Sequence, residues 1–228
     1  MSAYDAVCFD LDRTLCVSTQ DSAAVLERAF DRVGCEPFCT HTELEALVPR
    51  VPSAYTDQTF HENLFGLAAA EAGRDETVAT DLTEAYLDAY DPTAVRFRDG
   101  AKRIIAHARE ATDAVGLITN GSPSTQRPKL ETLGIADAFD VSVFVDPDAG
   151  VPPKPDPTPF ERALDGLGTR PDRTVHVGDA AYADVAGANA VGMDSAWLPG
   201  DATDRRSRDP THEPTYELSS LASLADVL

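Results

Sequence analysis

Five short runs rich in apolar and β-branched residues recur along this chain, and they constrain its fold more than any other feature. Segments with helical periodicity separate most of these runs, which lie at 6–9, 114–119, 141–145, 174–177 and 195–198. Strands that are apolar on both faces and alternate with helices are typical of a parallel sheet covered by helices. We therefore predict an α/β fold, with a Rossmann-like parallel sheet and helices on both of its faces.

The first two runs are about a hundred residues apart, which is too far for a single crossover helix. Within this interval Thr40 and Glu43 resemble a capping box at a helix start. Helical patterns fill the rest of it, at 22–33, 42–48, 59–72 and 76–90. We predict an α-helical cap domain over residues 17–92, inserted into a core domain of residues 1–16 and 93–228.

Proline and glycine mark further boundaries in the core. A helix over 122–133 is predicted by Ser-Pro at its start and Gly134 after its end. Pro128 conflicts with that helix and indicates a kink or a later start. Residues 200–214 are polar and rich in turn formers, so we predict a surface loop, and the apolar pattern at 216–228 predicts a segment that packs on the core.

The charge is strongly negative, with 39 acidic against 19 basic residues and a formal net charge of −20. The lysines number only three, at Lys102, Lys129 and Lys154. Acidic surfaces with arginine favoured over lysine resemble the proteins of organisms that keep molar salt in their cells, where self-repulsion is screened. We predict a halophilic protein, with an ordinary acidic bacterial protein as the alternative. Without a basic stripe to release counterions, a nucleic acid polymer is excluded as a partner.

The chain lacks the sequence features of a membrane protein, a secreted protein and a zinc protein. It has no apolar run long enough to span a bilayer and no basic-then-apolar start, so we predict a cytoplasmic protein without a membrane partner. Cys35 and Cys39 with His41 do not have a standard zinc spacing, Cys8 is most simply a small buried hydrophobe, and we assign no disulfide. The oligomeric state stays open.

Four polar clusters follow the predicted strands, where the carboxyl ends of parallel strands form ligand sites. Asp10 and Asp12 lie two residues apart, so their side chains point to the same side, and such a pair needs a cation, strong donors or a reaction. The clusters are DLDRT at 10–14, TNG at 119–121, Lys154 in KPDPTPF, and GDAAYAD with Asp179 and Asp184. Together these residue types suit phosphoryl transfer, in which an aspartate attacks phosphorus and cations cancel charge.

With all four motifs in this order, the chain resembles the haloacid dehalogenase (HAD) superfamily of phosphohydrolases, in the branch with a helical cap after the first strand. The resemblance covers essentially the whole core, whereas the cap is recognised only by its position and helicity. It implies a Mg²⁺-dependent phosphatase that hydrolyses a small phosphorylated metabolite through an aspartyl-phosphate intermediate. Phosphoglycolate, sugar phosphates and nucleotides all stay open as the small-molecule substrate.

The resemblance also implies roles for individual residues. Asp10 would be the nucleophile, and Asp12 would protonate the leaving group and then activate water. Lys154 would neutralise the phosphate, while Thr119 would hold a phosphate oxygen. Thr14 and the backbone at Asn120 and Gly121 would bind the substrate phosphate. Mg²⁺ would be held by Asp10, the backbone carbonyl of Asp12 and Asp179, with Asp184 ordering the metal waters or Lys154.

Each motif has a simpler interpretation when taken alone. Asn120-Gly121 is a common turn dipeptide, and Asp184 could be one more solvated acid in an acidic protein. Arg13 stands where the family most often has glycine, and we predict that it forms a surface ion pair. The joint presence of all four motifs favours the functional interpretation.

Three other functions compete with the phosphatase as interpretations of these motifs. A 2-haloacid dehalogenase-like hydrolase is disfavoured because those relatives lack the second aspartate, which is Asp12 here. A non-hydrolytic phospho-accepting signalling protein shares the acidic cluster, the threonine and the lysine, but carries no long helical insert. A phosphonate-cleaving relative needs a cap lysine, and this chain has none before Lys102. Candidate specificity residues in the cap are Arg50, Tyr55, His61 and Arg74.

Overall fold

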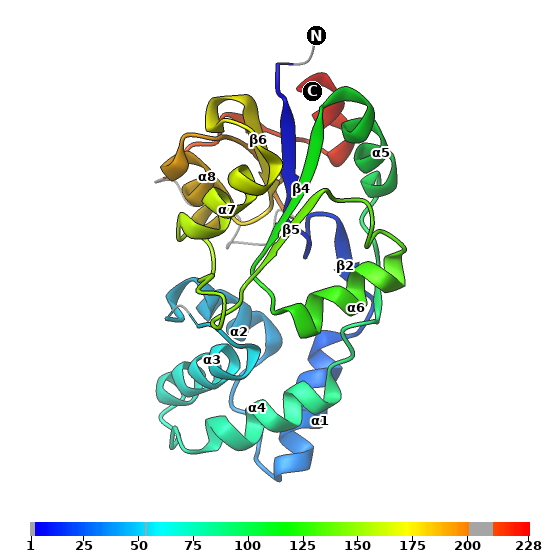
Figure 1. Cartoon of the computed structure of the whole chain (residues 1–228). Coiled ribbons are helices and arrows are strands. Elements are labelled where there is room, and N and C mark those ends of the chain that lie inside the picture. The colour runs from blue at the N-terminus through cyan, green and yellow to red at the C-terminus, as the bar shows by residue number, and fades with distance from the viewer. Residues whose placement is uncertain (1–2, 53, 201–211) are drawn as a thin grey trace.

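A computed structural model of the chain describes residues 3–52, 54–200 and 212–228 (Figure 1). These residues form a main sheet of six parallel strands in the order β5-β4-β1-β6-β7-β8, which confirms the predicted α/β fold. The strands are β1 (Ala6–Phe9), β4 (Ala114–Thr119), β5 (Val141–Phe144), β6 (Thr174–Gly178), β7 (Asp194–Trp197) and β8 (Tyr216–Glu217). Residues 201–211 of the predicted surface loop lie outside the described part of the chain.

Helices cover both faces of this sheet because the side chains of its strands alternate between two apolar clusters (Figure 1). On central strand β1, Val7 and Phe9 belong to one cluster and Cys8 to the other. The first cluster packs under α5 (Ala101–Ala111), α6 (Pro123–Leu133) and the 3₁₀ turn η4 (Leu221–Asp226). The second packs under α7 (Thr158–Leu167) and α8 (Ala186–Val191).

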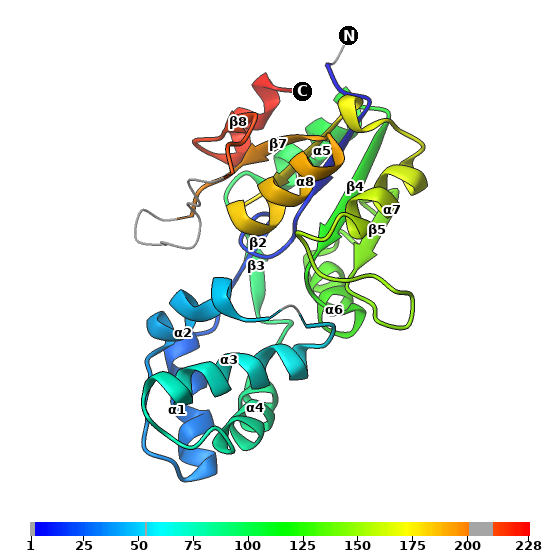
Figure 2. The same cartoon turned by 90° about the vertical axis from the view of Figure 1, so that its left-hand side faces the viewer.

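Four further helices pack around an apolar core of their own, which includes Phe30, Phe65 and Leu82. The helices are α1 (Ser22–Val33), α2 (His41–Leu47), α3 (Asp57–Glu71) and α4 (Val78–Ala89). Together with the described segments that join them, they are hereafter called the helical unit. The predicted capping box is confirmed at α2, where the Thr40 N–H donates to Glu43 Oε2 at 2.7 Å and the Glu43 N–H donates to Thr40 Oγ1 at 3.3 Å. The helical unit lies at the end of the sheet away from the two termini (Figures 1 and 2).

A two-stranded antiparallel ribbon joins the helical unit to the sheet domain, and the sequence analysis does not anticipate it. Its strands are β2 (Cys16–Ser18) and β3 (Val95–Phe97), with Cys16 opposite Phe97. Three-residue strands carry too little periodicity to be recognised, and their pairing joins segments about eighty residues apart. The remaining short turns are η1 (Val48–Arg50), η2 (Pro171–Arg173) and the π-helical turn η3 (Ala181–Val185).

Helix α6 starts at Pro123 and runs through Pro128, so the later start that Pro128 indicated is wrong. The N–H groups of Thr125 and Gln126 donate to the Ser122 carbonyl at 3.1 and 3.0 Å, so the helix is already formed upstream of the proline. Loss of one donor at Pro128 is tolerated because the helix buries Leu130 and other side chains against the sheet.

The C-terminal segment behaves as predicted, since Leu218, Leu221 and Leu224 are buried in the core of the sheet domain. All four cysteines are free thiols. Among the described residues, no helix is both long enough and apolar enough to cross a membrane.

Candidate active site

The carboxyl ends of neighbouring strands β1, β4 and β6 border a cavity of about 620 Å³, and the helical unit borders it from the other side. The predicted site residues lie around it with one exception. Those that line the cavity are Asp10, Asp12, Thr119, Asn120, Gly121, Lys154, Asp179 and Asp184. Segments separated by more than a hundred residues thus meet because β1 pairs with both β4 and β6.

Thr14 is the exception. Its side chain is buried and does not line the cavity, and its hydroxyl has no hydrogen-bond partner among the described residues. The predicted contact between Thr14 and a substrate phosphate therefore has no counterpart in this arrangement.

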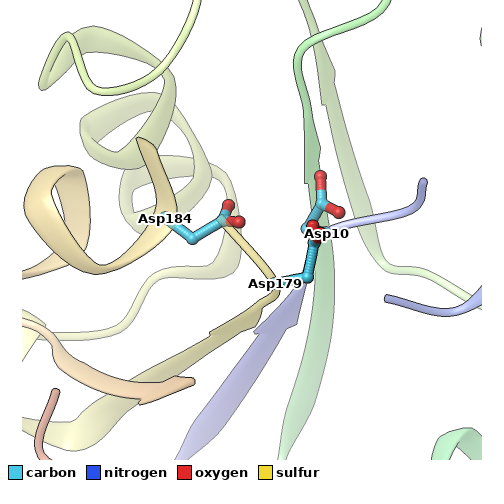
Figure 3. Close-up of side chains that lie close together, drawn as sticks. All are labelled: Asp10, Asp179 and Asp184. Atoms are coloured by element: carbon cyan, nitrogen blue, oxygen red, sulfur yellow. The ribbon is translucent and has the colours of Figure 1, made fainter. Parts of the chain in front are cut away.

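Three buried carboxylates form a compact acid trio of Asp10, Asp179 and Asp184, whose ligand atoms lie within 4.8 Å of one another (Figure 3). Burial raises the pKa of Asp10 to about 7, against the opposing attraction of Lys154. Burial, followed by repulsion from Asp10 and Asp184, raises the pKa of Asp179 to about 8. These carboxylates repel one another, and a hard divalent cation with oxygen ligands, such as Mg²⁺, suits this donor set.

Lys154 supplies a positive charge to two members of the trio, Asp10 and Asp184. Its ammonium group donates to Asp10 Oδ1 at 2.8 Å, to Asp184 Oδ1 at 2.6 Å and to the Ile118 carbonyl at 2.7 Å. Three acceptors match the three N–H bonds of the ammonium group. Burial lowers the pKa of Lys154, but the two carboxylates outweigh it and hold that pKa above its ordinary value.

The Asn120 side chain fixes the loop that carries Lys154. Its amide nitrogen donates to the Lys154 carbonyl at 3.0 Å, and its amide oxygen accepts from the Lys154 N–H at 2.7 Å. This reciprocal pair ties the end of β4 to the loop after β5. The side chain of Asn120 therefore has a positioning function that the TNG motif alone does not indicate.

Asp184 is held from several sides. Its Oδ1 accepts from His176 Nε2 at 2.9 Å and its Oδ2 from the Ala180 N–H at 3.0 Å. Burial raises the pKa of Asp184, but Lys154 and His176 outweigh it and hold that pKa well below its usual range. A Cβ at Gly178 would lie 2.1 Å from the carboxyl carbon of Asp184, so the glycine of the GDAAYAD motif makes room for this carboxylate.

His176 faces Asp184 from within β6 and is not among the predicted site residues. Burial lowers the pKa of this histidine, and its ring packs edge-on against Phe160 with a centroid distance of 5.1 Å. A histidine inside an apolar strand carries no signal that would separate a site residue from a core residue.

Asp12 lies apart from the acid trio and has partners of its own on α6. The Lys129 ammonium group donates to both oxygens of the Asp12 carboxylate, at 2.7 and 2.8 Å, and Gln126 Nε2 donates to Oδ2 at 2.9 Å. Burial lowers the pKa of Lys129, but the charge of Asp12 outweighs it and raises that pKa. A Cβ at Gly121 would lie 1.6 Å from Gln126 Nε2, so this glycine admits the glutamine.

Gln126 and Lys129 are site residues that the sequence analysis misses, since the predicted helix offers no reason to single them out. The scarcity of lysine is the one signal that could have pointed to Lys129. Of the three lysines in the chain, two contact the two aspartates of DLDRT.

Arg13 has a φ of 68°, which lies in the left-handed region that glycine adopts most easily. This backbone conformation explains why glycine suits the position. Its guanidinium lies 3.9 Å from Glu45 of α2 and 3.5 Å from Asp179. The predicted ion pair is confirmed, but one of its partners belongs to the acid trio.

The four polar candidates of the helical unit divide evenly. Tyr55 and His61 line the cavity, whereas Arg50 and Arg74 do not. Arg50 instead forms an ion pair with Glu71 on α3.

Both the sequence and the fold are similar to those of known proteins. A family model for haloacid dehalogenase-like hydrolases matches residues 4–192. The chain is 30% identical over 241 residues to a phosphoserine phosphatase from Thermus thermophilus, covering 93% of this chain and 94% of that protein. It is 30% identical over 230 residues to a glyceraldehyde 3-phosphate phosphatase from Methanopyrus kandleri, covering 98% of this chain and 96% of that protein.

A solved structure is similar over the full length. It is that of a predicted phosphoglycolate phosphatase from Haemophilus somnus, with a TM-score of 0.79 and 19% identity, covering 100% of this chain and 99% of that chain. At this identity the likeness shows the fold alone.

Proposed function

The chain belongs to the haloacid dehalogenase-like hydrolase family, and we propose that it is a Mg²⁺-dependent phosphatase acting on a small phosphorylated metabolite. One observation carries the proposal. Lys154 joins two members of the acid trio, Asp10 and Asp184, while a second aspartate, Asp12, lines the same cavity and has separate partners. Two aspartates in different environments suit two different roles, a nucleophile and a proton carrier.

In the first step, a carboxylate oxygen of Asp10 attacks phosphorus and the bond between phosphorus and the ester oxygen breaks. Asp12 gives a proton to the departing oxygen, so the products are an acyl phosphate on Asp10 and the free alcohol. Lys154 offsets negative charge at Asp10 from 2.8 Å. Thr119 and the backbone at Asn120 and Gly121 hold the phosphate oxygens.

In the second step, the ionised Asp12 takes a proton from water, and the water oxygen attacks phosphorus. The bond between phosphorus and the Asp10 oxygen breaks, which releases inorganic phosphate and restores the Asp10 carboxylate. Asp12 then holds the proton that the next cycle needs. Lys129 and Gln126 keep the Asp12 carboxylate in one orientation, so we assign both as positioning residues.

Asp10, Asp179 and the backbone carbonyl of Asp12 would hold Mg²⁺, with Asp184 in a supporting position through Lys154. When bound, the ion supplies positive charge beside the phosphate oxygens. The helical unit, within the predicted limits of residues 17–92, serves as the cap that closes the substrate side of the cavity.

Release of phosphate from p-nitrophenyl phosphate by the purified protein, in molar KCl with Mg²⁺, tests this proposal. We expect turnover by the wild type and loss of turnover in Asp10→Asn. The matched control is Asp165→Asn, which makes the same change at an exposed position of α7 and should retain full activity. A folded wild type that is inert across a broad panel of phosphate esters would contradict the proposal.

The same preparation separates the two alternative functions. A dehalogenase-like hydrolase would release halide from 2-haloacids. We expect no halide release, because the proposed role of Asp12 is to protonate a departing ester oxygen. A phospho-accepting signalling protein would keep its phosphoryl group, so we expect the acyl phosphate on Asp10 to turn over rather than accumulate. A long-lived phosphoprotein without phosphate release would favour the signalling function.

A further inference from the structure

The wall that the helical unit presents to the cavity is mainly apolar and aromatic. Tyr86 and Tyr90 lie with their rings nearly parallel, at an interplanar angle of 9° and a centroid distance of 6.4 Å. Phe60 packs edge-on against His61 at 5.2 Å, and His61 lies 5.1 Å from Tyr86. Aliphatic side chains extend this wall, namely Val48, Pro49, Val51, Pro52, Ala54 and Leu87.

Every basic side chain among the described lining residues is already committed. Lys154 gives all three of its N–H bonds to protein acceptors, and Lys129 is paired with both oxygens of Asp12. Burial lowers the pKa of His61 and so disfavours a charge on its ring, whose Nδ1 donates to the Asp57 carbonyl at 2.8 Å. No arginine stands among the described residues that line the cavity.

The helical unit adds a negative charge instead of a positive one. Asp57, the first residue of α3, lines the cavity, and its Oδ2 accepts from the Ser122 hydroxyl at 3.0 Å. A second anionic group on a substrate would therefore meet a carboxylate and aromatic rings, with no free cation to replace its water. An uncharged group would avoid both this repulsion and the cost of desolvating a charge.

We propose that this site selects phosphate monoesters whose alcohol part is uncharged and carries an aromatic or apolar group, and that it rejects esters with a carboxylate or a second phosphate. The cavity of about 620 Å³ has the size of pockets that hold drug-sized ligands, and an aromatic group would gain from the rings of Phe60, Tyr86 and Tyr90. The inference rests on the proposed phosphatase function and names the substrate class of the same site.

Two pairs of esters that differ by one carboxylate provide the test. Uridine 5′-monophosphate is compared with orotidine 5′-monophosphate, and benzyl phosphate with 4-carboxybenzyl phosphate. We expect kcat/KM to be at least about tenfold lower for the carboxylated member of each pair, because its charge is desolvated without a partner. Equal values or a preference for the carboxylated esters would overturn the inference.

Variants show whether the proposed wall causes the selection. Asp57→Asn keeps an acceptor for Ser122 and removes the charge. The ratio of kcat/KM between the uncarboxylated and the carboxylated ester of each pair should therefore fall by about threefold. Glu84→Gln removes an exposed charge of α4 that does not line the cavity, and it should leave the ratio unchanged. Phe60→Leu should lower kcat/KM for benzyl phosphate by about fivefold and leave that for ethyl phosphate unchanged. A ratio unaffected by Asp57→Asn would contradict the part given to this wall.

Binding separates this inference from the proposed function. Affinities of Asp10→Asn for the two nucleotides, measured by calorimetry with Mg²⁺, compare the alcohol parts without turnover. Weaker binding of the carboxylated nucleotide supports the inference even where the wild type hydrolyses neither ester, a result that would count against the phosphatase alone. Tighter binding of the carboxylated nucleotide overturns the inference whatever the wild type hydrolyses.

Discussion

At the carboxyl edge of the sheet, each charged side chain of the site lies against a group of opposite charge, whereas the helical unit across the cavity offers aromatic rings and one carboxylate. Lys154 joins Asp10 to Asp184 with both carboxylates buried, and Lys129 joins Asp12 to α6. On the facing side, Phe60, Tyr86 and their neighbours are held by apolar packing within the helical unit.

The two sides of the cavity are stabilised by different interactions, and this difference affects how freely each can change. Buried charges at the sheet edge need fixed partners, since an unpaired one is costly, and this requirement keeps the reacting groups in one geometry. Apolar packing is less directional, so the wall can change its shape and chemistry without disturbing the charges. In the proposed function, catalysis and substrate choice rest on parts of the chain with separate cores.

Removing the charge of Lys154 should have the largest effect on activity and stability. In Lys154→Met, Asp10 and Asp184 stay buried without their shared partner, so we expect at least about a 1,000-fold loss of kcat and about 3–5 kcal/mol of the free energy of unfolding. Steady-state kinetics and urea unfolding measure the two effects. Lys102→Met, on the exposed face of α5, is the matched control and should change neither by a comparable amount. Activity retained in Lys154→Met would contradict this account of the edge.

Low salt should disturb the helical unit before the sheet. Residues 17–92 contain 15 acidic and four basic residues, a net charge of −11 out of −20 for the chain. The screening length grows from about 3 Å in 1 M salt to about 10 Å in 0.1 M salt, so repulsion within this third of the chain rises on dilution. As KCl is removed, we expect amide hydrogen exchange in α1, α3 and α4 to accelerate first. Exchange in β1, β4 and β6 should accelerate only at lower KCl concentrations.

Sucrose at matched osmolality is the control for this dilution, because it supplies no ions and should not restore protection. Unchanged melting between low and molar KCl would remove the ground for predicting a halophilic protein.

Loosening Asp12 should affect turnover far more than stability. In Lys129→Met we expect kcat to fall by between about 10- and 100-fold, because the proton carrier loses its orientation. The free energy of unfolding should change by no more than about 1 kcal/mol, since the side chain of Asp12 is 43% exposed. Lys129→Arg, which keeps the charge and two donors, should recover most of kcat. A purely structural role predicts the reverse, with a large loss of stability and little change in kcat per folded molecule.

The acid trio should make the metal-free protein less stable as the pH rises. Folding raises the pKa of Asp10 to about 7 and that of Asp179 to about 8, so their contribution is present below about pH 4 and is lost as the pH rises through 7 to 8. The lowered pKa of Asp184 acts only below that window. We expect Tm to fall by a few degrees between pH 5.5 and 8.5, since about 1 kcal/mol corresponds to roughly 2–4 °C at this chain length.

Calorimetry with and without Mg²⁺ checks this expectation, and the stabilisation by Mg²⁺ should be larger at pH 8.5 than at pH 5.5. Asp179→Asn should flatten the pH dependence of the metal-free protein. A Tm that rises with pH in the metal-free wild type would contradict the raised pKa values of Asp10 and Asp179.

Much of the sheet domain could be predicted because its signals are local. Buried strands such as 6–9 and 174–177 are continuous apolar runs, and glycines close several of the helices between them. The motifs fall at strand ends, and parallel strands bring their carboxyl ends to one edge, so the meeting of Asp10, Thr119 and Asp179 follows from topology. Thr14 does not follow this rule, because its side chain is buried and does not line the cavity.

The α/β alternation, the four motifs in their order, and the acids and lysine at the strand ends can be recognised along the chain. The pairings among these side chains cannot, because they depend on tertiary packing. The contacts of Lys129 with Asp12, Asn120 with Lys154 and His176 with Asp184 depend on how a helix is rotated and where a loop crosses. The apolar wall of the cavity, likewise, depends on which face of each helix turns inward. The physical reason is that periodicity and spacing act along the chain, whereas charge pairing and cavity shape act between segments that only packing brings together.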